Sequence, residues 1–183
     1  MHGLKKIAVV LAVTLFAAGC NGKQEQLHGK KPPAQGTTEK VHLIWKQADN
    51  KWMVKLNGGP EVNPDQAKSE IKKDKGPRAF EVDIQGPTNA TFKTADGLTV
   101  WEGPVTPAGK KAPPPTSPTG FGSTQIVGPV VSADGKTLVF VDLNYGDAVT
   151  LNYALHFNQP TDPSKPKIPS VDPIIDNGGG EWS

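Results

Sequence analysis

Short runs in which apolar residues recur at every second position fill the middle of the chain. The clearest run is 151–157, where Leu151, Tyr153, Leu155 and Phe157 share one face. A period of two, rich in aromatic and β-branched residues, indicates half-buried strands. We interpret the following runs as strands: 41–46, 51–56, 80–85, 90–94, 98–101, 130–131, 137–143 and 151–157.

Turn residues separate several of these runs and predict hairpins. Asp49-Asn50 lies between the first two runs, Asp96-Gly97 between 90–94 and 98–101, and Asp134-Gly135 between 130–131 and 137–143. Asp, Asn and Gly tolerate positive φ, which the tightest hairpin turns require. We therefore expect each pair of runs to form neighbouring antiparallel strands.

Residues 63–73 are compatible with two structures. Asn63-Pro64-Asp65-Gln66 has the features of a helix start, with an N-cap residue, proline at the first position and glutamine at the third. Ala67 and Ile71 are the only apolar residues that follow, so any helix is short. A strand over 67–71 is the alternative, and we expect the helical turn.

The pattern as a whole predicts an all-β protein, an antiparallel β-sandwich over residues 40–160. The stretch 103–120 contains Pro113-Pro114-Pro115, and proline cannot supply the backbone donor of a sheet. We interpret it as a long loop, because the few strands after it could not bury a core alone. Residues 20–39 are predicted as a flexible tether, and 161–183 as an irregular tail that adds one short edge strand.

The middle of the chain resembles cupredoxin-like and immunoglobulin-like domains. The resemblance rests on Pro64, Lys75-Gly76, the run that begins at Phe80, and the aromatic residues Phe92 and Trp101. It implies a sandwich fold. Blue-copper sites require a cysteine thiolate, and the single cysteine, Cys20, precedes the domain. Copper electron transfer of that type is therefore excluded.

The first nineteen residues form a targeting segment. Lys5 and Lys6 precede an apolar run, 7–18, which is shorter than the roughly 20 residues of a membrane span. The residues Ala17, Ala18, Gly19 and Cys20 then resemble the cleavage motif of bacterial lipoprotein precursors, with alanine at Ala17 where leucine is commoner.

The lipoprotein resemblance implies that 1–19 is a cleaved signal peptide. Cys20 would become the first residue of the mature protein and carry acyl chains such as palmitate, which anchor it in the membrane. Asn21 stands where an aspartate in this family signals inner-membrane retention. We therefore expect an outer-membrane protein of the cell envelope that faces the periplasm.

Charge argues against a nucleic-acid partner. The chain has 20 basic and 18 acidic residues, and removal of Lys5 and Lys6 with the signal peptide leaves equal numbers. Nucleic-acid binding proteins usually carry a basic excess, so we expect no such partner.

Few residues offer candidate chemistry. His42 and His156 would form a metal pair only if their strands converged. Glu81 and Asp83 alternate on one strand, as a carboxylate pair would, but we expect them to form the polar outer face of a half-buried strand. The sequence contains no nucleophile elbow, zinc-binding helix or phosphate loop. Trp101 is out of phase with Leu98 and Val100. Its ring is therefore either exposed and able to stack on sugars, or packed under the proline-rich loop that begins two residues later, and we expect the packed ring.

Three functional hypotheses follow. The first is a non-enzymatic, lipid-anchored envelope protein that binds or scaffolds another envelope component, without catalytic residues, cofactor or metal. The second is a carbohydrate or cell-wall binding module that uses Trp101. The third is a metal-binding or hydrolytic envelope enzyme that uses His42 and His156.

Overall fold

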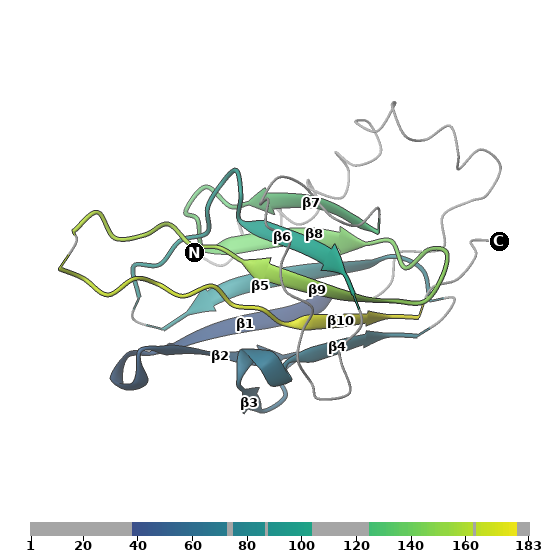
Figure 1. Ribbon diagram of the computed structural model, residues 1–183, viewed down its shortest axis with the longest axis horizontal. Helices are drawn as coiled ribbons and strands as arrows, with labels where there is room; N and C mark the ends of the chain where they lie inside the picture. Colours follow the sequence, from purple (N-terminus) through teal and green to yellow (C-terminus); the bar gives the residue numbers. More distant parts are fainter. Residues whose placement is uncertain (1–37, 73–74, 87, 104–124, 163, 179–183) are drawn as a thin grey trace, which may run out of the picture.

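Two β-sheets pack face to face in the computed structural model, which describes residues 38–72, 75–86, 88–103, 125–162 and 164–178 (Figure 1). The six-stranded sheet has the order β3-β2-β1-β5-β8-β7, and the four-stranded sheet has the order β4-β10-β9-β6. The strands of the first sheet are β1 (Glu39–Lys46), β2 (Lys51–Leu56), β3 (Glu61–Val62), β5 (Arg78–Gln85), β7 (Ile126–Val131) and β8 (Thr137–Asp142). Those of the second are β4 (Lys68–Ile71), β6 (Leu98–Glu102), β9 (Val149–Leu155) and β10 (Ile174–Asn177).

The all-β sandwich predicted from the sequence is confirmed, but the sheets are mixed rather than wholly antiparallel. β1 pairs with β5 in parallel, and β10 pairs with β4 in parallel. Parallel neighbours need a crossover connection. Here the chain leaves β1, passes through β2, β3 and the other sheet's β4, and returns as β5.

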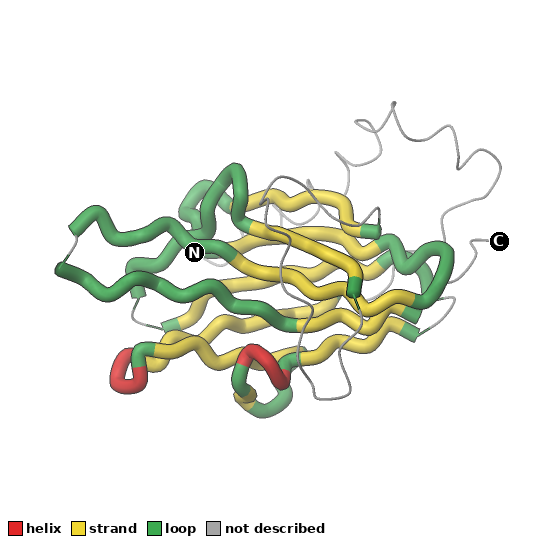
Figure 2. Tube along the Cα trace, in the orientation of Figure 1, coloured by secondary structure: helices red, strands yellow, loops and turns green. Residues whose placement is uncertain are grey.

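Helical structure in the described segments is limited to two short 3-10 turns, η2 (Gln47–Asp49) and η3 (Pro64–Gln66), drawn in red in Figure 2. Both structures considered for 63–73 therefore occur in sequence: η3 turns the chain, and β4 follows it. Among these residues no helix is long and apolar enough to cross a membrane.

Two of the three predicted hairpins are confirmed. Asn50 adopts a φ of 49° between β1 and β2, and Gly135 a φ of 68° between β7 and β8. The predicted hairpin at Asp96-Gly97 is wrong, because Phe92 forms an isolated bridge with Phe157, and β6 pairs with β9, which ends two residues before Phe157. Residues 93–97 therefore form a loop between Phe92 and β6, and both of these pair with the stretch 151–157.

The core lies between the sheets and follows the alternation of the strands. Phe80 and Phe140 stack with centroids 4.9 Å apart, and Tyr153 of the opposite sheet meets Phe140 edge-on at 5.6 Å. All three side chains are buried. Burial of such large apolar surfaces is the main favourable contribution to folding.

The predicted domain boundaries need correction at the carboxyl end. The sandwich extends to Asn177, and β10 is not an edge strand, because it lies between β4 and β9. Ile174 and Ile175 are buried there, and this burial fixes the strand inside the sheet. The signal peptide, the tether as far as residue 37 and the proline-rich residues 104–120 lie outside the described residues.

Candidate functional site

Polar side chains form rows across the outer face of the six-stranded sheet. Val41 and Leu43 point into the core, so Lys40 and His42 point outward from β1. β5 runs parallel to β1 in a register that sets Lys40 opposite Glu81 and His42 opposite Asp83. The pairing of two strands distant in sequence thus creates rows of facing polar side chains.

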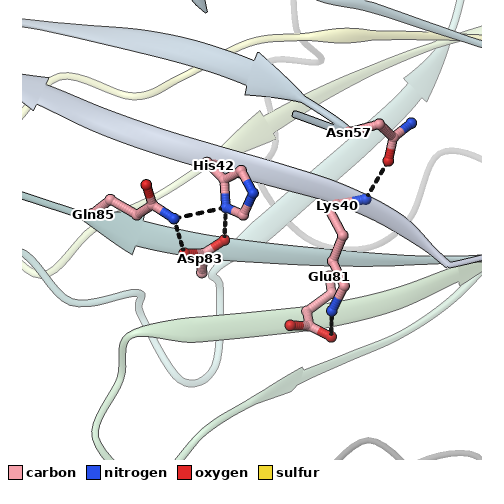
Figure 3. Close-up of polar contacts among 6 residues, drawn as sticks. All are labelled: Lys40, His42, Asn57, Glu81, Asp83 and Gln85. Carbon is pink, nitrogen blue, oxygen red and sulfur yellow. Dashed lines mark hydrogen bonds and ion pairs between the residues drawn. The ribbon is translucent and has the colours of Figure 1, made fainter. Parts of the chain in front are cut away.

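The contacts within these rows are shown in Figure 3. Lys40 Nζ lies 2.5 Å from Glu81 Oε2, and the Lys40 backbone N–H donates to Asn57 Oδ1 at 2.8 Å. His42 Nδ1 bonds to Asp83 Oδ1. Gln85 Nε2 donates to Asp83 Oδ2 at 2.9 Å and lies 2.9 Å from His42 Nδ1.

The arrangement holds an imidazole in a fixed orientation on an accessible surface. His42 and Asp83 side chains are 25% and 27% exposed, and the carboxylate fixes the ring through Nδ1. Proton-transfer catalysis on a nucleophile also needs a hydroxyl or thiol beside the imidazole. The recorded side-chain partners of His42 are a carboxylate and an amide, so the geometry suits hydrogen bonding to a ligand better than covalent catalysis.

The two carboxylates that the sequence offered as a catalytic pair, Glu81 and Asp83, each contact a basic side chain. Glu81 pairs with Lys40, and Asp83 pairs with His42. A glycosidase-type pair requires one carboxyl group free to act as acid and one as base or nucleophile. Glu81 and Asp83 therefore form part of the polar outer face of the sheet, and their contacts do not match those of a glycosidase pair.

His42 and His156 do not converge. His42 lies on the outer face of one sheet, whereas His156 follows β9 in the other sheet and lies between the buried residues Leu155 and Phe157. His156 Nε2 lies 2.9 Å from Thr99 Oγ1, and burial, together with nearby Lys93, lowers the His156 pKa. Within the described segments no group of three metal-ligating side chains comes together.

Trp101 is buried, which agrees with the expectation of a packed ring and contradicts the alternative of an exposed, sugar-stacking one. It lies on β6 with 6% of its surface exposed, and its backbone pairs with Asn152, which is also buried. Its phase relative to Val100 places it on the outer side of the four-stranded sheet. The alternation of residues along β6 predicts that the Trp101 ring faces the outer side of the sheet, but it does not predict that the ring is buried there.

Sequence reasoning missed a polar cluster between the sheets. Glu39 of β1 is 6% exposed and accepts hydrogen bonds from Ser69 Oγ and Arg78 Nη1, both at 3.1 Å. Ser69 belongs to the four-stranded sheet and Glu39 to the six-stranded one. The carboxylate therefore links the two layers.

A second link in the same cluster involves Asp142 at the end of β8. Its Oδ1 accepts from Asn177 Nδ2 at 2.7 Å and from the Asn144 backbone N–H at 2.8 Å. Burial raises the pKa of Asp142 to about 7, although the Asn144 hydrogen bond and the charge of Arg78 oppose the rise. Burial also raises the pKa of the Tyr153 phenol well above its usual range, and the negative charge of Glu39 adds to this.

The sequence carried a signal for this cluster. Glu39 is in phase with Val41 and Leu43, and Asp142 is in phase with Leu138 and Phe140, so both polar residues occupy inward positions. An inward polar residue at a strand end predicts a buried hydrogen-bonded group. Which residues meet there depends on how the sheets are stacked.

An open depression of about 470 Å³ lies beside this end of the four-stranded sheet, over β4, β9 and β10. Asp176, which lines it, pairs with Lys68 at 2.5 Å and accepts from Thr150 Oγ1 at 3.0 Å. The Asp176 carboxylate is therefore already paired within the protein.

Cys20 and its preceding motif, Ala17, Ala18 and Gly19, lie outside the described residues. No family model matches the chain, and no curated protein matches it. A solved structure, the cysteine protease inhibitor EhICP2 from Entamoeba histolytica, is similar over 76% of this chain and 95% of its own, with 8% identity and a TM-score of 0.30.

Proposed function

We propose that this protein is a lipid-anchored component of the cell envelope that binds or scaffolds another envelope molecule and has no enzymatic activity. Acyl chains on Cys20 hold it in the membrane, with the sandwich in the periplasm of an outer-membrane location. The resemblance of Ala17, Ala18, Gly19 and Cys20 to the lipoprotein motif supports the anchor.

The position of the chain ends in the sandwich supports a role in presenting a surface. β1 begins at Glu39 and β10 ends at Asn177, and both residues belong to the polar cluster at one end of the fold. The segment that leads back to Cys20 therefore joins the sandwich at its cluster end, which leaves the opposite end of the sandwich available to a partner.

The polar rows of β1 and β5 support binding rather than catalysis. Lys40, His42, Glu81 and Asp83 are paired with one another on an accessible sheet face. Such groups exchange hydrogen bonds with a ligand at little cost, whereas covalent chemistry needs a nucleophile that these contacts do not include. Burial of Trp101 removes the residue on which the glycan-binding alternative depended.

The test is formaldehyde crosslinking of the acylated protein in intact native cells, followed by mass spectrometry of the co-purified material. A reproducible protein partner, absent from a parallel sample of Cys20→Ser, supports the proposal. Recovery of cell-wall glycan alone, or of nothing, contradicts a protein scaffold. The Cys20→Ser variant must also leave the membrane fraction, because it lacks the acylated thiol.

A further inference from the structure

The connection between β9 and β10 carries a basic, proline-rich segment at the end of the sandwich remote from the polar cluster. Figure 1 shows this loop, in yellow-green and yellow, extending past the neighbouring strands at the left. We call residues 165–169, with the sequence Lys-Pro-Lys-Ile-Pro, the arm. Lys165, Pro166, Lys167 and Pro169 are all exposed, and Ile168 is partly buried.

The base of the arm is held to the domain by specific contacts. The Gln159 side chain donates to the Ile168 carbonyl and accepts from the Ile168 N–H, both at 2.9 Å. Trp52 Nε1 donates to the Pro169 carbonyl at 3.1 Å. The Ile168 side chain packs against the core, so the arm is fixed from one side and accessible from the other.

The composition of the arm favours one backbone conformation. Proline fixes φ near −65°, and the residue before a proline is restricted to extended conformations. Pro166 and Pro169 are separated by two residues, the spacing that places both rings on one side of a polyproline II helix with three residues per turn. A segment ordered in this way loses little conformational entropy when it binds.

Charge defines the surface that the arm fits. Lys165 and Lys167 have no ion-pair partner within the described residues. Nearby Asp162 directs its carboxylate to the Ser164 N–H at 3.0 Å and the Ser164 hydroxyl at 2.7 Å. Both proline rings and both cationic side chains of the arm are therefore accessible to a partner.

We infer that the arm is a recognition segment that docks in a groove of a partner protein, with aromatic residues on the floor for the proline rings and acidic residues on the rim for Lys165 and Lys167. Polyproline segments bind aromatic-lined grooves in this way. The inference rests on the proposed function and adds to it the part of the surface that makes contact and the chemistry of the partner.

The probe is a photoreactive benzoylphenylalanine at Ser170, an exposed position next to the arm that leaves both lysines in place. Irradiation of intact native cells should give a protein adduct whose crosslinked peptide lies beside acidic and aromatic residues. Lys165→Glu with Lys167→Glu should lower the adduct yield about tenfold, since it removes two favourable charge contacts and adds repulsion. Pro166→Ala with Pro169→Ala should lower it several-fold through loss of preorganisation.

The matched control is Lys72→Glu with Lys75→Glu, which makes the same charge change at two exposed residues beside the polar cluster. It should leave the adduct yield unchanged. Pro60→Ala, at an exposed proline outside the arm, is the control for the proline variant. Thermal unfolding of each purified variant must match the parent, which separates lost contact from lost folding.

Three results overturn the inference. One is an adduct whose yield is the same in the arm and control charge variants, and another is an adduct that muramidase digests, which identifies wall glycan. The third is no adduct at Ser170 while formaldehyde crosslinking captures a protein partner. In that case the scaffold function stands and the arm is not its contact, whereas absence of any partner in the formaldehyde experiment removes the function itself.

Discussion

The two ends of the sandwich are closed by different chemistry. At the polar end, Glu39 and Asp142 join the sheets through hydrogen bonds to Ser69 and Asn177. At the other, aromatic end, Trp45, Trp52, Phe92 and Phe157 pack through three ring contacts, with centroids between 4.8 and 5.4 Å apart.

The difference matches what each end must support. The polar end holds the first residue of β1 and the last residue of β10, and its directional hydrogen bonds fix these strand ends. The aromatic end supports the loop that carries the arm, because Trp52 stacks on Phe157 and donates a hydrogen bond to the Pro169 carbonyl. The stability of the polar end therefore depends on the protonation state of Asp142, whereas the stability of the aromatic end depends on the packing of its rings.

Trp52→Ala should cause the largest loss, because it removes the ring shared by two of the three aromatic contacts. Truncation of a buried tryptophan costs about 3–5 kcal/mol. Urea unfolding of purified protein measures the change. A loss below about 1 kcal/mol would show that the aromatic end does not depend on this ring.

Raising the pH should weaken the polar end selectively. The pKa of Asp142 is about 7 in the folded protein and lies below this when unfolded, so the folded state binds more protons between these values. The contribution of Asp142 to the free energy of unfolding is complete below about pH 4 and is lost as the pH rises through 7. The total loss is up to about 4 kcal/mol.

Asp142→Asn isolates this effect, since the amide oxygen still accepts from Asn177 and Asn144 and the side chain no longer ionises. The difference in unfolding free energy between variant and parent should grow in favour of the variant from pH 4 to pH 8. His156, whose lowered pKa acts in the opposite sense, is present in both proteins. A constant difference across this range would contradict the assignment.

Glu39→Ala should cost about 2–3 kcal/mol, because it leaves the Ser69 hydroxyl and the Arg78 guanidinium without their shared acceptor. Ser69→Ala removes one donor and should cost about 1 kcal/mol. Equal losses from the two variants, measured by urea unfolding, would mean that Arg78 finds another partner or becomes hydrated.

Trp52→Phe should cost less than Trp52→Ala, about 1–2 kcal/mol, because it keeps an aromatic ring but removes the hydrogen bond to Pro169 and part of a buried side chain. The effect should concentrate in the arm, where hydrogen exchange of the Ile168 amide becomes faster. Unchanged exchange at Ile168 would show that Gln159 alone holds the base of the arm.

Local pattern was enough to predict most strands, but not the partners of every strand. Residues 90–94 alternate as a strand would, yet only Phe92 forms a bridge, because β9 already pairs with β6 over the adjoining stretch. β10 was expected at an edge, since its apolar content is small. Its place between β4 and β9 depends on a parallel contact that no local signal encodes.

The candidate sites show the same division. His42 and Asp83 were visible as polar residues on strand faces, but their contact depends on the parallel register of β1 and β5. Trp101 was correctly placed out of phase with Val100, yet its burial depends on what covers the sheet rather than on alternation. The prolines and lysines of the arm are local sequence features, whereas its anchoring by Trp52 and Gln159 depends on tertiary contacts.

The sequence by itself determined that the protein is built of strands, because side chains alternate between core and solvent at every second residue along each one. It also determined which positions face inward, including Glu39 and Asp142. Only the tertiary structure decided that these carboxylates meet Ser69 and Asn177 at one end, and that aromatic rings meet at the other. The physical reason is that hydrogen bonds and ring contacts between two sheets join residues far apart in the chain, and stacking of whole sheets fixes those pairs.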